Sequence, residues 1–216
     1  MVLISVEGAI GAGKSEFCRL LAENDDIEFI VRTEPVADWN VVGDDGTSYN
    51  ALTEFYRDQK KYACMFQTLV LRTRVEQAKN ITHGFVERCI HSDKVFGAIQ
   101  KLLGNMNAIE YATYLYQFNQ AIRDTPEIHG HIYIRTSVKT CLERIVRRNR
   151  EGEDDITEDY LRMLEGEHEK WLYKPDDPKI LIIDGEIDFR SEEAVQEIIE
   201  RVKVFVLKLC KLRKKE

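Results

Sequence analysis

Residues 8–15, which read GAIGAGKS, are the feature that most constrains the fold of this chain. They match the pattern G-x-x-x-x-G-K-[ST], with Gly8, Gly13, Lys14 and Ser15 in the required positions. An apolar run at residues 2–6 precedes the motif, and residues 16–23 follow it with apolar side chains at helical spacing. The glycines let backbone N–H groups converge on phosphate oxygens at a helix N-terminus. This context favours a phosphate-binding loop over a glycine-rich turn that binds nothing.

Within such a loop, Lys14 is expected to reach the β- and γ-phosphates and Ser15 to ligate Mg²⁺. The loop defines a phosphate donor site. It leaves open which phosphoryl acceptor is used, or whether water is the acceptor.

Composition narrows the class of acceptor. The chain has 216 residues, is 44% hydrophobic and shows no break in composition, so we expect one compact domain over residues 1–216. A formal net charge of -7 argues against nucleic-acid binding. The five cysteines are scattered without zinc-ligand spacing, and no apolar run is long enough to cross a membrane. These features predict a soluble, cytoplasmic protein with reduced thiols.

The remaining periodicity alternates between strands and helices. We expect strands at 27–31, 84–89, 132–137 and 179–184, a loop at 41–48, and helices at about 49–80, 92–103, 108–123, 138–148, 157–171 and 191–212. Ser92 and Asp93 are candidate N-caps of the helix that follows them. The order predicts an α/β fold, a three-layer sandwich around a five-stranded, mainly parallel sheet.

Charged residues follow several of these strands. Pro35 holds Glu34 at a strand end, and Glu87 and Arg88 close the next strand. Ligands of open α/β sheets bind at the carboxyl ends of the strands, so these side chains should lie near the phosphate loop.

An arginine-rich segment follows the fourth strand. Arg144, Arg147, Arg148 and Arg150 precede an acidic stretch at 151–155. The density of arginines favours a mobile lid, at about residues 147–156, over an ordinary solvated helix end. His129 and His131 alternate on a strand without a third ligand, so they are interpreted as structural.

Taken in order, these motifs resemble the deoxyribonucleoside kinase family over nearly the whole chain. The landmarks are the phosphate loop, Glu34-Pro-Val with Trp39, Tyr56 ahead of Phe66-Gln67, Glu87-Arg88, Ser92-Asp93, the arginine lid with Glu153, and Asp188-Phe189. The resemblance implies transfer of a phosphoryl group from ATP, with Mg²⁺, to the 5′-hydroxyl of a deoxynucleoside in nucleotide salvage. It also implies a homodimer.

The resemblance assigns roles residue by residue. Glu34 matches the general base and Arg88 an arginine at the 5′-oxygen, which with Lys14 are the expected catalytic residues. Tyr56 and Glu153 match the pair that holds the sugar 3′-hydroxyl, Gln67 a bidentate contact with the base, and Ser15 and Glu87 the Mg²⁺ site. The expected ATP-binding residues are Gly8, Ala9, Ile10, Gly11, Ala12, Gly13, Lys14, Ser15, Arg144, Arg148, Arg150, Asp188 and Phe189. The expected substrate-binding residues are Val36, Trp39, Leu52, Tyr56, Phe66, Gln67, Val70, Arg74, Arg88, Asp93, Phe96 and Glu153.

Base selection should rest on Val70, Arg74 and Asp93. The arginine and aspartate resemble those of the cytidine and purine kinases, whereas thymidine-accepting members have smaller or apolar residues there. We therefore expect deoxycytidine or a purine deoxynucleoside to be preferred over thymidine.

Departures and alternatives remain. Glu16 stands where the family has Ser or Thr, and its carboxylate would disfavour binding of a triphosphate unless the side chain points away. Phe96 lies one residue earlier in the chain than the corresponding aromatic residue of the family. A nucleoside monophosphate kinase shares the loop, sheet and lid, and a non-catalytic scaffold would bind ATP without turnover.

Overall fold

The structure is a computed structural model that describes residues 1–24, 29–79, 81–187, 189 and 191–214. The strands are β1 (Leu3–Glu7), β2 (Val31–Arg32), β3 (Asn40–Val42), β4 (Ser48–Asn50), β5 (Gly84–Glu87), β6 (Gly130–Arg135) and β7 (Ile180–Asp184). The helices are α1 (Lys14–Glu23), the 3₁₀ helix η1 (Val36–Trp39), α2 (Ala51–Arg57), α3 (Gln59–Ala78), α4 (Ile90–Leu102), α5 (Ala108–Asp124), α6 (Val138–Arg148), α7 (Glu158–Leu172) and α8 (Glu192–Arg213).

Five strands form the central sheet in the order β2-β5-β1-β6-β7. Every pairing in it is parallel. All residues of β1 are buried, because neighbouring strands flank it on both edges and helices cover both faces. The predicted five-stranded parallel sheet is confirmed, with the strand that leads into the phosphate loop at its centre.

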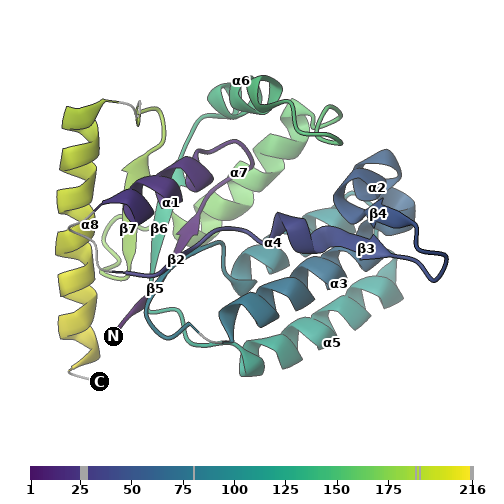
Figure 1. Cartoon of the computed structure of the whole chain (residues 1–216), viewed down its shortest axis with the longest axis horizontal. Coiled ribbons are helices and arrows are strands. Elements are labelled where there is room, and N and C mark those ends of the chain that lie inside the picture. Colours follow the sequence, from purple (N-terminus) through teal and green to yellow (C-terminus); the bar gives the residue numbers. More distant parts are fainter. Residues whose placement is uncertain (25–28, 80, 188, 190, 215–216) are drawn as a thin grey trace.

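Helices cover the sheet on both sides (Figure 1). Helix α1 packs on β1, β2 and β5, and α8 packs on β7. On the other side lie α7 and a group formed by α3, α4 and α5. The predicted three-layer sandwich is therefore confirmed.

Successive side chains of β6 contact helices on opposite faces of the sheet. Phe205 and Leu209 of α8 come close to Gly130, whereas the Tyr133 ring stacks on His168 of α7, with centroids 6.4 Å apart. Odd- and even-numbered residues of this strand thus face opposite layers, as expected of a strand buried on both faces.

The prediction of one continuous helix over residues 49–80 is wrong. The chain forms two helices, α2 and α3, separated at Asp58, whose φ of -148° and ψ of 80° are not helical. The Asn50 side chain accepts a hydrogen bond from the backbone N–H of Thr53, and that of Asp58 accepts one from Lys61, so each helix has its own N-cap. Residue 80 lies outside the described part of the chain.

The loop expected at 41–48 is an antiparallel hairpin instead. Val41 pairs with Tyr49 in the β3–β4 ladder. Gly46, with a φ of +81°, occupies the left-handed region that the tight turn between the strands requires.

The expected N-caps Ser92 and Asp93 are also wrong. Helix α4 begins earlier, at Ile90, with Cys89 at the N-cap position. The Glu7 carboxylate accepts hydrogen bonds from the Cys89 backbone N–H and the Ser92 hydroxyl, so a side chain from β1 takes the place of a local cap. By contrast, Ser137 and Ser191 cap α6 and α8, at the starts that the sequence predicts.

One close contact joins α4 to α5 and generates a stability prediction. A Cβ atom added to Gly97 would lie 2.4 Å from Cε1 of Tyr114. The Tyr114 ring is fully buried and cannot move aside. We expect Gly97→Ala to lower the free energy of unfolding by about 1–3 kcal/mol in urea titrations, the usual cost of overpacking.

Gly166→Ala in α7 is the matched control. No heavy atom lies within 4 Å of its added Cβ, so the higher helix propensity of alanine should raise stability by up to about 1 kcal/mol. Equal effects of the two substitutions would contradict the assigned α4–α5 contact.

Candidate active site

The phosphate loop runs from the end of β1 to the start of α1. Gly8, Gly11 and Gly13 have φ values of +149°, +78° and +102°. A Cβ atom at Gly8 would lie 2.7 Å from the Ile134 carbonyl oxygen, and one at Gly11 would lie 2.5 Å from that of Cys141. Conformation and close packing both demand glycine here, which explains the motif physically.

Lys14 is buried inside this loop. Its Nζ donates a hydrogen bond to the Ala9 carbonyl, 2.7 Å away. Burial lowers the pKa of Lys14 to about 8, and the neighbouring Arg88 contributes to the same shift. A phosphate in the loop would offset this cost by giving the ammonium a negative partner.

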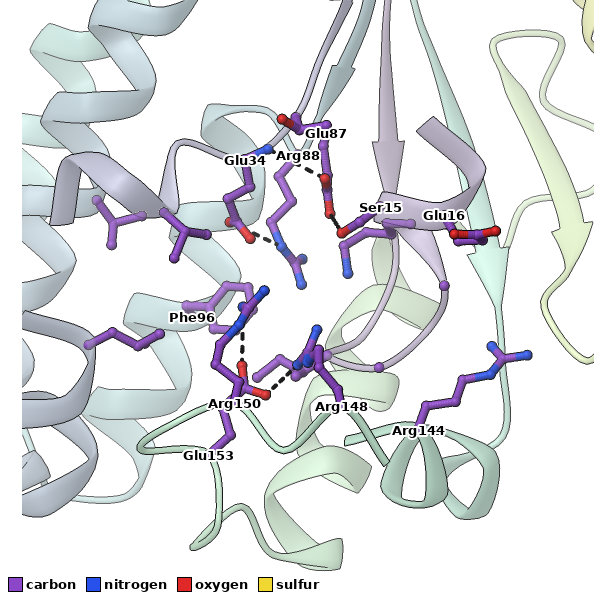
Figure 2. A pocket seen from close by; sticks show the side chains of 18 of the residues that line it. Ser15, Glu16, Glu34, Glu87, Arg88, Phe96, Arg144, Arg148, Arg150 and Glu153 are labelled. Carbon is purple, nitrogen blue, oxygen red and sulfur yellow. Dashed lines mark hydrogen bonds and ion pairs between the residues drawn. The ribbon is translucent and has the colours of Figure 1, made fainter. Parts of the chain in front are cut away.

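Ser15 and Glu87 bring two oxygen ligands together (Figure 2). The Ser15 hydroxyl donates a 2.7 Å hydrogen bond to Oε1 of Glu87. The other oxygen, Oε2, accepts a 3.4 Å hydrogen bond from the backbone N–H of Glu34. A hydroxyl and a carboxylate are hard oxygen donors of the kind that Mg²⁺ prefers, so this pair fits the expected ion.

Glu34 follows β2 and lies between two arginines. Its Oε1 is 2.9 Å from Nη2 of Arg74 and 3.4 Å from Nε of Arg88. Burial would raise the pKa of Glu34, but Arg88, Arg74 and Lys14 overcome this effect and lower it to about 2. The carboxylate is therefore ionised throughout the neutral range.

Arg88 adopts an unusual backbone conformation just after β5. Its φ of +61° is in the left-handed region, which costs free energy for a residue with a side chain. Nη1 donates a 3.0 Å hydrogen bond to the Gly8 carbonyl, and the guanidinium lies 4.8 Å from the centre of the Phe96 ring. These contacts aim the guanidinium into the cavity beside Glu34 (Figure 2).

Arg74 links two carboxylates that lie far apart in the sequence. Its Nε donates to both carboxylate oxygens of Asp93, at 2.8 and 3.0 Å, while Nη2 contacts Glu34. Arg74 and Asp93 have only 3% and 1% of their surface exposed. Burial raises the pKa of Asp93 to about 6 even though Arg74 acts in the opposite direction, so the carboxylate depends on this arginine for its charge.

Aromatic side chains form the apolar wall of the cavity. The Phe66 ring stacks on Phe55 with centroids 4.8 Å apart, and Trp39 meets Phe66 edge-on at 5.4 Å. The indole N–H of Trp39 donates to the Thr73 hydroxyl, which fixes the orientation of the ring. The wall can hold a flat, mostly apolar group such as a nucleobase.

The arginine-rich segment closes the opposite side. Arg148 and Arg150 both contact the Glu153 carboxylate, which is 4% exposed (Figure 2). Arg144 donates instead to the backbone carbonyls of Ala12, at 3.0 Å, and Gly185, at 2.8 Å. The segment is thus tied to the phosphate loop, and all four of its arginines line the cavity.

Glu16 lies at the rim of the cavity and pairs with a neighbour in its own helix. Its carboxylate accepts hydrogen bonds from Arg19 within α1, and this contact lowers its pKa. The side chain points away from the other labelled residues at the rim of the cavity (Figure 2). Because the Glu16 carboxylate points away, a triphosphate could bind beside it.

One cavity of about 920 Å³ collects most of the expected residues. Every expected substrate-binding residue lines it: Val36, Trp39, Leu52, Tyr56, Phe66, Gln67, Val70, Arg74, Arg88, Asp93, Phe96 and Glu153. So do these expected donor-side residues: Ile10, Gly11, Gly13, Lys14, Ser15, Glu87, Arg144, Arg148, Arg150 and Phe189. Asp188 lies outside the described residues.

Several residues that line the cavity are not among the expected site residues, including Phe55 and Tyr160. Phe55 belongs to the apolar stripe of the second expected helix, where nothing separates a pocket residue from a core residue. The Tyr160 hydroxyl accepts a 3.4 Å hydrogen bond from Gln100 of α4, a contact visible only in the folded chain.

Comparison with known proteins agrees with this geometry. The family model described as deoxynucleoside kinase matches residues 4–207. Deoxycytidine kinase 2 of Gallus gallus is 34% identical, over 94% of this chain and 89% of that protein. Mitochondrial thymidine kinase 2 of Macaca fascicularis is 32% identical, over 90% of this chain and 74% of that protein. The chain belongs to the deoxynucleoside kinase family.

A solved structure extends the comparison to three dimensions. The deoxyadenosine kinase from M. mycoides with bound dCTP superposes with a TM-score of 0.77 at 26% identity, covering 94% of this chain and all of that one. This protein is accordingly a deoxynucleoside kinase, with ATP as the phosphate donor that the family implies. Of the helices in the described ranges, none has the length and apolar character to cross a bilayer.

The bridge made by Arg74 generates a second stability prediction. Arg74→Met leaves two carboxylates at the cavity without their shared cation. Removal of one partner from a buried ion pair typically costs about 3–5 kcal/mol, and we expect a loss of this size in urea unfolding.

Arg72→Met, on the same helix, is the control. The Arg72 side chain is 65% exposed, so its replacement should change the free energy of unfolding by no more than about 0.5 kcal/mol. If Arg74→Met were as stable as this control, the two carboxylates would not depend on Arg74.

Proposed function

We propose that this protein transfers the γ-phosphoryl group of ATP to the 5′-hydroxyl of deoxycytidine or a purine deoxynucleoside, in preference to thymidine. The observation that carries the proposal is the buried Arg74–Asp93 pair, which lies in the same cavity as Glu34 and the phosphate loop.

On the donor side, residues 8–15 would hold the phosphates, with Arg148 and Arg150 on the transferred group. Ser15 and Glu87 would hold Mg²⁺, which when bound neutralises charge on the phosphate oxygens. Phe189 lines the cavity and would lie against the adenine of ATP. The protein would contribute mainly position and positive charge, which phosphoryl transfer chiefly requires.

Glu34 would act as the general base. Its low pKa makes it a weak base in the ground state, so its first contribution is to orient the 5′-hydroxyl for in-line attack. In a loose transition state the hydroxyl proton is lost late, when the oxygen has become far more acidic, and an ionised carboxylate can then accept it. Arg88, beside Glu34, would contact the 5′-oxygen and the transferred phosphate.

The sugar would lie between Tyr56 and Glu153. Burial raises the pKa of the Tyr56 hydroxyl well above its usual value, so the hydroxyl remains a hydrogen-bond donor. Glu153 offers acceptor oxygens beside the two arginines that contact it. Together they suit a 3′-hydroxyl, and the resemblance to the family implies that deoxyribose is favoured over ribose.

The base would pack against the aromatic wall with its edge toward Gln67 and Asp93. Gln67 is buried, and its amide both donates and accepts hydrogen bonds, which suits a bidentate contact with a base edge. The Asp93 carboxylate can accept from an exocyclic amine, whereas the Arg74–Asp93 pair leaves little room for a thymine methyl group. Val70 lines the cavity and matches the residue of family members with a roomier pocket, a feature that acts against discrimination of thymidine.

We also propose an oligomeric state and a cellular compartment for the protein. The family resemblance favours a homodimer formed through helices, and exposed apolar side chains on α5, Ile109 and Tyr116, are compatible with it. The five cysteines are free thiols, which suits the reducing environment of the cytoplasm.

Glu34→Gln tests the assigned base. The substitution keeps the size of the side chain but removes its charge and its ability to accept a proton. We expect kcat with labelled ATP and deoxycytidine to fall by about 10²–10⁴-fold, while the dissociation constant for deoxycytidine changes far less.

Glu76→Gln, an exposed change on α3, serves as the control and should leave kcat unchanged. A Glu34→Gln enzyme that retained kcat within a few fold would rule out this carboxylate as the base. It would leave the family membership untouched.

A further inference from the structure

A second group of chemically reactive side chains lies outside the substrate cavity. Glu7 is the last residue of β1, His131 lies on β6, and Cys89 follows β5 at the N-terminus of α4. Glu7 and His131 lie on neighbouring strands, and Cys89 follows the strand on the other side of β1, because β1 lies between β5 and β6 in the sheet. None of them lines the 920 Å³ cavity.

Their ligand atoms are close together. A carboxylate oxygen of Glu7, Sγ of Cys89 and a ring nitrogen of His131 all lie within 4.8 Å of one another, the one such group in the described part of the chain. Ligands of a single tetrahedral zinc ion lie about 3.5 Å apart, so only small side-chain movements separate this arrangement from a coordination shell. The group combines a carboxylate, a thiol and an imidazole, the donors found in zinc sites.

Neighbouring side chains already hold these donors in place. Ser5 Oγ lies 2.7 Å from Nδ1 of His131, and the indole ring of Trp171 packs edge-on against the imidazole at 5.2 Å. Such outer contacts fix the orientation of metal ligands in known sites. Glu7 is fully buried and Cys89 is 4% exposed, so a cation would be shielded from water.

We propose that Glu7, Cys89 and His131 form a binding site for a borderline-soft divalent cation of the zinc class. A thiolate with an imidazole favours zinc over magnesium, which prefers oxygen ligands alone. Burial raises the pKa of the Cys89 thiol, so the thiol is protonated until the cation arrives. On binding, the S–H bond breaks, a sulfur–metal bond forms and the proton passes to the solvent.

The site would join three strands behind the active site. Gly8 follows Glu7 directly, and Arg88 directly precedes Cys89. The Gly8 carbonyl also accepts the hydrogen bond from Arg88, so both ligands adjoin one catalytic contact. The alternative is that the group only ties β1 to α4 through the hydrogen bonds from Glu7 to Cys89 and Ser92.

Cobalt substitution distinguishes the two accounts. The full-length protein is stripped with a chelator and titrated with Co²⁺, whose bond to a thiolate gives a charge-transfer absorption band. We expect about one Co²⁺ per chain with this band, and its displacement by Zn²⁺ but not by Mg²⁺. Cys89→Ser should abolish the band, and His131→Gln should weaken binding by about a hundredfold or more.

Cys64→Ser is the matched control, because Cys64 is a half-buried thiol remote from the group. It should bind Co²⁺ as the unmodified protein does, and circular dichroism checks that each variant is folded. Absence of the band in the unmodified protein, or its persistence in Cys89→Ser, would overturn the proposal. The titration of the unmodified protein tests the proposal even if none of the variants folds.

Discussion

The buried guanidinium of Arg74 is the interaction on which the arrangement of the active site depends. It satisfies Asp93 through Nε and Glu34 through Nη2, and it donates through Nη1 to the Glu87 carbonyl at 3.3 Å. Without it, these two neighbouring carboxylates, which have little access to water, would lack the cation that they share. In our account one cation therefore holds in place both the group that would select the base and the group that would orient the 5′-hydroxyl.

The parallel sheet brings the other parts to the same edge. The phosphate loop follows β1, Glu34 follows β2, and Glu87 and Arg88 lie at the end of β5; these strands are adjacent in the sheet. The carboxyl ends of parallel strands share one edge, so local chain order is sufficient to gather donor and acceptor residues there. The proposed cation site is arranged differently: Glu7 ends β1 and Cys89 follows β5, but His131 lies near the amino end of β6, in register with Ser5.

The sequence predicts what local patterns encode and misses what depends on long-range contact. The five-stranded parallel sheet and the starts of α6 and α8 follow from short-range spacing and are confirmed. The break at Asp58 is missed because apolar spacing continues across it. The start of α4 is misplaced because its orphan N–H is satisfied by Glu7, 82 residues away. The sequence treats His131 as structural because Glu7 and Cys89 approach it only in the folded sheet.

Rates for the four natural deoxynucleosides, each with ATP and Mg²⁺, test the central claim that the Arg74–Asp93 pair sets the choice of base. We predict that kcat/KM for deoxycytidine, deoxyadenosine or deoxyguanosine exceeds that for thymidine by about tenfold or more, the usual discrimination from one poorly accommodated methyl group. The highest kcat/KM with thymidine would contradict the account.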